Sequence, residues 1–291
     1  NRAEPAVKLD VIARPVGIEE SLMQAPSVPL THETKTRDVY WEHLWDLVVI
    51  LTQKEIKARY KNSALGYVWS VANPLLFAVI YYIVFGQIMK VPIENYSLFL
   101  MAALLPWHWL ANSVIAAPNV FLANATLIKK VRFPRNVLVV SYVLNEGIHF
   151  VLSIPVIAGF LLVNHMTPTM TWLTGIPVLL VAQFLIVYGI AITLASLNLF
   201  FRDLERLTAL FVTVLFFLTP ITYSSAMVPD SYRTLLYANP VAPLIESWRE
   251  LFMHGQLSWL VVGTCYLSAC GTLLIGSLVY WRMSSKFAEV I

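Results

Sequence analysis

Two ionisable side chains beside a long apolar stretch are the first candidates for chemistry. Glu146 and His149 are about one helical turn apart, and no Asp, Glu, Lys or Arg follows Glu146 until Arg202. Ionisable groups inside a membrane span are costly and are functional candidates by default. The pair would suit a proton relay, or Glu146 is simply held by polar neighbours such as Asn145. We favour the second interpretation, because coupled transport normally needs more than one such site.

A second group consists of Lys57, Arg59 and Lys61, in the stretch EIKARYKNSALGYVWSVANPLL (residues 55–76). These cations end a charged segment, and the next charged residue is Lys90. Arg grips a phosphate through two parallel hydrogen bonds, whereas Lys acts as a compact charge. Cations also suit a helix C-terminus, and anionic lipid attracts them by about 1 kcal/mol each. The group is therefore either a phosphate site at the membrane surface or a membrane anchor.

Motifs for catalysis are absent from the sequence. It has no GxxxxGK[ST] phosphate-binding loop, and no HExxH, GxSxG or DxD motif or Cys/His cluster. Cys265 and Cys270 lie in an apolar run, where we expect them to pack as small residues. The chain is therefore predicted to be no enzyme, to bind no metal and to hydrolyse no ATP itself.

Aromatic side chains recur at helical spacing in two apolar segments. In the first segment Trp69, Phe77 and Tyr81 share a four-residue spacing with the amide Asn73, and the second segment carries Phe217 and Tyr223. Aromatic rings stack on the apolar faces of sugars and leave the hydroxyls free, so such rows suit a sliding polysaccharide. Helix packing and interfacial belts account for most membrane aromatics, and that alternative stays open.

The elements that position these residues must be membrane helices. Of the 291 residues, 58% are hydrophobic and 13% charged, with a mean hydropathy of +0.69, whereas soluble domains carry about 25% charged residues. The net charge of +3 is too small to suggest nucleic acid. A span needs about 20 apolar residues. Six are predicted in an all-α membrane fold, at about 65–88, 98–122, 137–163, 176–200, 207–220 and 258–281.

Lys and Arg set the predicted orientation. If the N-terminus lies inside, 17 of the 20 basic residues fall in the cytoplasmic segments 1–63, 122–136, 201–206 and 282–291. Positively charged loops stay on the cytoplasmic side. Both termini are therefore expected in the cytoplasm.

The rest of the chain divides into four regions. Residues 1–40, rich in Pro, are expected to form a cytoplasmic tail, and residues 41–61 an amphipathic helix on the membrane surface. Residues 62–291 would then be the six-span domain. Within it, residues 221–256 are too apolar for a solvated loop and too interrupted by Pro for a span. Two short re-entrant helices would fit them.

Four stretches together resemble polysaccharide-exporting ABC permeases, the type-2 exporters that move O-antigen, teichoic acid or capsule. The first is the 55–76 stretch quoted above. The others are KKVRFPRNVLVVS (129–141), NLFFRDLERL (198–207), and LTPITYSSAMVP with ANPVAPLIESWRELF (218–229 and 238–252). Each is weak alone, but their order and spacing are those of the family.

The resemblance implies a homodimer in the bacterial inner membrane with one ATP-binding cassette subunit beneath each copy. ATP and Mg would bind those partners, and this chain would need no cofactor. A polyprenyl-pyrophosphate-linked glycan would enter at Lys57, Arg59 and Lys61. It would cross a channel lined by Trp69, Asn73, Phe77, Tyr81, Phe217 and Tyr223. The residues expected to contact the ATPase are Lys129, Lys130, Arg132, Phe133, Arg135, Arg202 and Asp203. The outer segment 221–256 would be a gate.

Other functions remain open at this point. A drug- or lipid-exporting ABC permease shares the architecture. Only the many aromatic residues and the four stretches quoted above argue against that function. A membrane glycan-processing enzyme or a proton-coupled transporter would need a catalytic or relay set that the sequence does not offer.

Overall fold

The computed structural model describes residues 33–60, 68–89, 93–232 and 239–287, and all that follows concerns these residues. Residues 1–43 and 44–291 form two separate compact units. The described part of the first unit is the beginning of one helix, and the site residues lie in the second. Among the described residues there is no strand, as the all-α prediction requires.

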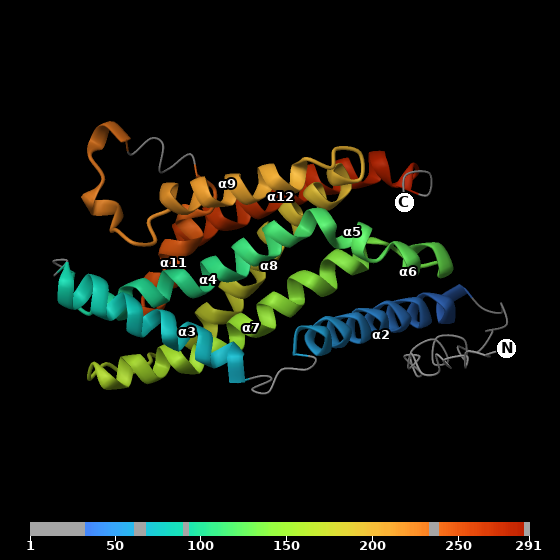
Figure 1. The fold of residues 1–291 in the computed structure, drawn as a ribbon. Helices are drawn as coiled ribbons and strands as arrows, with labels where there is room; N and C mark the ends of the chain where they lie inside the picture. Colours follow the sequence, from blue (N-terminus) through green and yellow to red (C-terminus); the bar gives the residue numbers. More distant parts are fainter. Residues whose placement is uncertain (1–32, 61–67, 90–92, 233–238, 288–291) are drawn as a thin grey trace, which may run out of the picture. The chain divides into compact units, whose positions relative to one another are not determined.

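The helices follow the order of Figure 1. Their bounds are α2 Glu33–Tyr60, α3 Val68–Tyr81, α4 Tyr96–Ala116, α5 Val120–Ala123, α6 Ala125–Lys130, α7 Asn136–Val163, α8 Thr171–Asn198, α9 Leu204–Leu218, α11 Ala242–His254 and α12 Trp259–Ser284. A π-helical segment, Tyr82–Ile88, continues α3, and two short 3-10 turns lie at Ala117–Asn119 and Ser225–Met227.

Four of the predicted spans are confirmed as helices long and apolar enough to cross a bilayer. They are Tyr96–Ala123, Asn136–Val163, Thr171–Asn198 and Trp259–Ser284. The predicted first and fifth spans are helical over 68–88 and Leu204–Leu218, but these helices are not among the four. The count of six spans therefore stays a prediction.

Helix α2 begins at Glu33, eight residues before the start at 41 that the sequence predicted for a membrane-surface helix. Leu51 is buried, and Leu44, Leu47 and Val48 pack against the core. Trp45 is 66% exposed.

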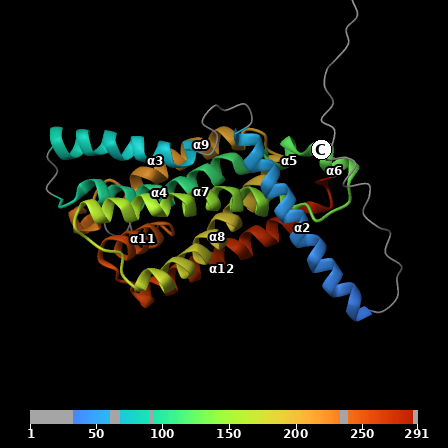
Figure 2. The ribbon, with the colours of Figure 1, turned by 90° about the horizontal axis from the view of Figure 1, so that it is seen from below.

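Helix α4 lies at the centre of the second unit. It contacts α3, α7, α8, α9 and α11, and these neighbours flank it in two perpendicular views (Figures 1 and 2). The buried Gln183 on α8 ties the layers together, because it donates to Pro106 O at 2.8 Å and accepts from Trp248 Nε1 at 2.6 Å. Three helices, α4, α8 and α11, thus meet at one buried amide.

Helices α8 and α12 approach each other closely enough for their backbones to touch. A Cβ atom on Gly189 would lie 2.5 Å from the Thr272 carbonyl carbon, and one on Gly276 would lie 2.5 Å from Gly189 O. Small residues permit such contact in membranes, where packing rather than water drives helix association.

The described part of segment 221–256, which the sequence predicts to lie on the outer side, contains α11, the turn Ser225–Met227 and helical residues 230–232. Residues 233–238 lie outside the described part, so the predicted pair of re-entrant helices stays untested. Arg249 on α11, 6% exposed, holds this segment to the bundle. Its guanidinium donates to Pro220 O at 2.5 Å and Ile221 O at 3.0 Å, and lies 3.8 Å from the centre of the Phe99 ring.

Candidate functional site

The last turn of α2 brings a guanidinium against a buried carboxylate on α7. Arg59 Nη1 donates to Glu146 Oε2 at 3.3 Å, and Nη2 donates to Oε1. The contact is thus the two-bond arrangement that suits Arg and carboxylate. The Glu146 side chain is 2% exposed and that of Arg59 is 35% exposed. Glu146 is therefore buried inside the protein, whereas Arg59 is accessible at the protein surface.

Two amides complete the surroundings of this carboxylate. Asn112 Nδ2 on α4 donates to Glu146 Oε2 at 3.2 Å, and Asn145 Nδ2 donates to Oε1 at 3.4 Å. A buried charge is tolerated only when it is paired and hydrogen-bonded. Each oxygen of Glu146 therefore has two donors, one from Arg59 and one from an amide.

Close packing of α4 on α7 places these groups together. Trp109 on α4 donates from Nε1 to Val143 O at 3.0 Å. Its ring lies over Gly147, where a Cβ atom would come within 2.8 Å of the indole. Because position 147 has no side chain, the helices approach at the level of Glu146, and Asn112 reaches the carboxylate.

A second contact holds α2 one to two turns before Arg59. Lys54 Nζ donates to Asn124 Oδ1 at 2.7 Å. Asn124 separates α5 from α6, the short helix that ends at Lys130. The end of α2 is thus fixed at two points, of which one is a charge pair and the other a charge–amide bond.

The three basic residues predicted to bind a phosphate are only partly brought together in the described part of the chain. Lys57 is exposed, Arg59 is paired with Glu146, and Lys61 lies outside the described part of the chain. The alternative chosen for Glu146, that polar neighbours such as Asn145 hold it, is confirmed. The sequence reasoning assigned Arg59 and Glu146 to separate sites and missed their pairing. The available signal was that a carboxylate inside a span needs a cation.

The predicted ATPase-coupling residues lie on two loops. Lys129 and Lys130 end α6, and Arg132 follows, all three exposed. Phe133 and Arg135 help to line a groove of about 670 Å³ against Tyr280–Ser285 at the end of α12, where Arg135 Nη1 donates to Ser284 O at 3.0 Å.

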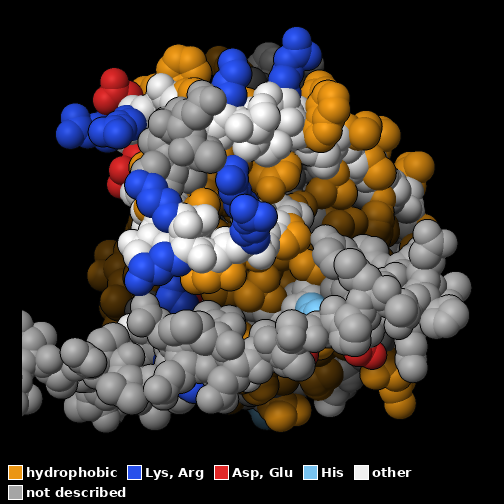
Figure 3. All heavy atoms as spheres, turned by 90° about the vertical axis from the view of Figure 1, so that its right-hand side faces the viewer, with side chains coloured by type: hydrophobic (Ala, Val, Ile, Leu, Met, Phe, Trp, Pro, Cys, Tyr) orange, Lys and Arg blue, Asp and Glu red, His pale blue; other side chains and the backbone are white. Residues whose placement is uncertain are grey.

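Arg202 and Asp203 are exposed on a different loop, the turn between α8 and α9. The end of the bundle that carries α5, α6 and the end of α12 presents many Lys and Arg side chains (Figure 3).

The predicted channel residues are placed in part. Trp69 and Phe217 are 43% and 69% exposed. Phe77 is half-buried against His108, with ring centres 5.8 Å apart. The Tyr223 hydroxyl donates to Phe217 O at 3.0 Å, so these two residues are neighbours. The side chains of Asn73 and Tyr81 lie outside the described part.

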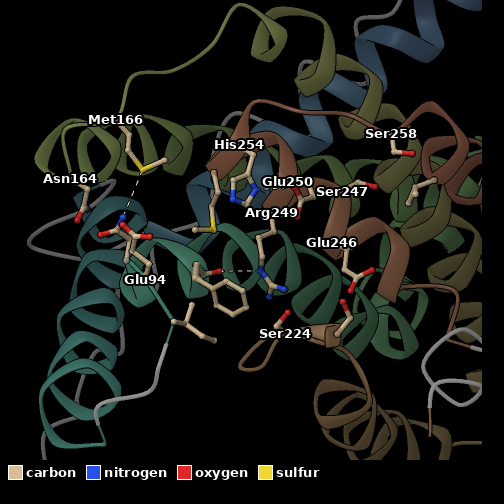
Figure 4. Close-up of a pocket in the computed structure, with 16 residues that line it drawn as sticks. Glu94, Asn164, Met166, Ser224, Glu246, Ser247, Arg249, Glu250, His254 and Ser258 are labelled. Atoms are coloured by element: carbon tan, nitrogen blue, oxygen red, sulfur yellow. Dashed lines mark hydrogen bonds and ion pairs between the residues drawn. The ribbon is translucent and has the colours of Figure 1, made fainter. Parts of the chain in front are cut away.

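The sequence analysis did not foresee a cavity of about 690 Å³ at the other end of the bundle. Its walls come from the starts of α4 and α12, the loop after α7, the turn at 224–225 and α11 (Figure 4). Glu94, Glu246 and Glu250 line it, and Glu250 pairs with His254 at 2.9 Å. Arg249 also lines the cavity, and its guanidinium is engaged by backbone carbonyls.

Comparison with known proteins supports the resemblance noted in the sequence. A family model described as "ABC-2 type transporter" matches residues 46–253. The chain is 45% identical over 249 residues to the O-antigen export system permease protein RfbA of Klebsiella pneumoniae. The aligned region covers 86% of this chain and 96% of that protein.

More distant relatives carry related names. Identity is 34% over 214 residues with RfbA of Myxococcus xanthus, covering 72% of this chain and 82% of that protein. It is 24% over 221 residues with the polysialic acid transport protein KpsM of Escherichia coli, covering 72% and 83%. The predicted resemblance to polysaccharide-exporting permeases is confirmed: this chain belongs to the ABC-2 type transporter family of membrane proteins.

Proposed function

We propose that this chain is the transmembrane subunit of an ABC transporter that exports a polyprenyl-pyrophosphate-linked polysaccharide, such as an O-antigen, across the bacterial inner membrane. The observation that carries the proposal is the 45% identity, over 86% of the chain, to a protein named as an O-antigen export permease. Two copies of the chain and two ATP-binding cassette subunits would form the transporter, with six spans per copy and both termini in the cytoplasm.

ATP hydrolysis takes place in the partner subunit under this proposal. The chain itself has no phosphate-binding loop. The exposed basic residues Lys129, Lys130 and Arg132 on and after α6 support a docking surface for that partner, with the groove beside Arg135 next to them. The concentration of Lys and Arg at this end also supports its cytoplasmic orientation (Figure 3).

The lipid-linked substrate enters where α2 ends. Arg59 is 35% exposed there although its guanidinium is paired with Glu146, and the exposed Lys57 on the same turn adds positive charge that attracts a phosphate. The glycan then passes along aromatic side chains, of which Trp69 and Phe217 are exposed and Phe77 and Tyr223 are half-buried.

Deletion of the gene in the source bacterium tests this function. Surface polysaccharide should disappear, and a glycan attached to an acid-labile polyprenyl pyrophosphate should accumulate in the inner membrane. The wild-type gene should restore export, and an ATP-binding cassette subunit should co-purify with the tagged chain. Unchanged surface polysaccharide with increased sensitivity to amphiphilic drugs would contradict the proposal and favour a drug exporter. ATPase activity of the chain alone would contradict the assignment of hydrolysis to a partner.

A further inference from the structure

We propose that Glu146 is the resident counter-ion of Arg59 and that the phosphate-bearing headgroup of the exported lipid displaces it during loading. Glu146 would then be a specificity-determining residue, which reserves Arg59 for an anion able to out-compete a carboxylate. The inference rests on the proposed function, which supplies a lipid pyrophosphate, and it adds a step and three residues to that function.

The geometry of the pair favours exchange. A guanidinium presents the same two-bond fork to a carboxylate and to a phosphate. Both terminal nitrogens of Arg59 are now directed at the two oxygens of Glu146. A phosphate that approaches this edge of Arg59 therefore replaces the carboxylate instead of adding to it. A resident carboxylate also excludes weak anions, because these do not repay the loss of the existing bonds.

The exposure of the two side chains sets the direction of approach. Arg59 is 35% exposed and ends a helix whose preceding turn carries the exposed Lys57. Glu146 is 2% exposed and lies behind the guanidinium. Glu146 is the tenth residue after Asn136, where α7 begins. At about 1.5 Å per residue it lies about 15 Å along the helix axis from that end. A headgroup therefore meets the cation first, and the buried carboxylate remains in the protein.

Asn112 and Asn145 make the displaced state tolerable. A buried carboxylate left without donors is strongly unfavourable. Asn112 donates to one oxygen at 3.2 Å and Asn145 to the other at 3.4 Å. When the guanidinium turns to a phosphate, each oxygen keeps one amide donor.

Substitution of each partner should change phosphate binding in opposite directions. The test uses the complete transporter, chain and ATPase subunit together, in phosphatidylcholine nanodiscs with undecaprenyl pyrophosphate as the probe and undecaprenol as its uncharged control. Glu146→Gln removes the competing charge and should lower the Kd for the probe by about tenfold, equivalent to about 1.4 kcal/mol. Arg59→Gln should raise it by about tenfold or more. Undecaprenol binding should not change in either variant.

Lys54→Gln is the matched control. It removes one positive charge from the same helix, and Lys54 bonds Asn124 rather than Glu146. Its Kd for the probe should stay within about twofold of the wild type, because the Gln amide can still donate to Asn124 Oδ1 and the charge that is lost is not directed at Glu146. If Glu146→Gln does not fold, Glu146→Asp takes its place. The shorter side chain keeps the charge and loosens the pair, so tighter binding is again expected.

Three results would overturn the inference. If Glu146→Gln weakens probe binding as Arg59→Gln does, Glu146 only positions the guanidinium. If both variants bind like the wild type, the pair only anchors α2. If phosphatidylglycerol in the nanodisc displaces the probe with the same dependence on Glu146, the site binds membrane lipid in general. Failure of the proposed function looks different, because the wild type would then bind undecaprenyl pyrophosphate no better than undecaprenol.

Discussion

Replacement of Arg249 by Met should loosen the outer segment from the bundle. Met keeps an apolar stem of similar length but has no donor. The substitution leaves Pro220 O and Ile221 O without the bonds they accept at 2.5 and 3.0 Å, and it removes the cation from the Phe99 ring. The longer bond to Phe99 O, at 3.4 Å, adds little.

The expected loss follows from these contacts. Two bonds from a charged donor are worth about 1.5 kcal/mol each at the low end, and the cation–π contact about 1 kcal/mol. These contacts amount to about 4 kcal/mol, and the net loss is smaller because Met also escapes the penalty of burying a charge. We therefore expect a loss of about 2–4 kcal/mol.

Thermal unfolding of the purified chain in detergent provides the assay. At about 2–4 °C per kcal/mol for a domain of this size, the apparent Tm should fall by about 4–16 °C. The Tm of Arg249→Lys should fall by less, because the lysine ammonium can still donate to one of the two carbonyls. Glu250→Gln, on an exposed side chain of the same helix, is the control and should leave the Tm unchanged. If Arg249→Met unfolds at the same temperature as the wild type, the contacts of Arg249 do not hold this segment to the bundle.

Three further predictions concern packing, coupling and the glycan path. Gly276→Leu should abolish folded protein in size-exclusion chromatography, because its Cβ would lie 2.5 Å from Gly189 O, whereas Gly263→Leu, with nothing within 4 Å, should elute normally. Replacement of Lys129, Lys130 and Arg132 by Glu should lower co-purification of the ATPase subunit without lowering the amount of inserted chain, and normal co-purification would leave them as topology signals. Trp69→Phe should keep export and Trp69→Ala should lose it at equal protein level, whereas equal loss of protein in both would mark Trp69 as a packing residue.

Hydropathy alone predicted where four spans lie, because the thickness of the bilayer fixes the length of a membrane helix. The predicted 137–163 and the observed Asn136–Val163 differ by one residue. The start of α2 at Glu33 escaped prediction, since ETKTRDVY has no apolar periodicity to mark a helix.

The candidate site was harder to predict than the spans. Arg59 and Glu146 are 87 residues apart, and periodicity fixes the face on which a side chain lies but not its partner. The outer cavity could not be foreseen for a related reason. Its walls come from five separate segments, and no single one of them carries a pattern that marks a cavity.

The backbone contact between α8 and α12 has a mechanical consequence for any transport cycle. Where Gly189 and Gly276 touch, no flexible side chain lies between the helices to absorb a change in their spacing. We expect these two helices to move as one stiff rod and to serve as the fixed frame of the subunit. Deformation during transport then falls to parts held by polar contacts that can be exchanged, namely the end of α2 and the outer segment around α11. Distance measurements by spin labels on α8 and α12 should accordingly give one narrow distribution in every nucleotide state.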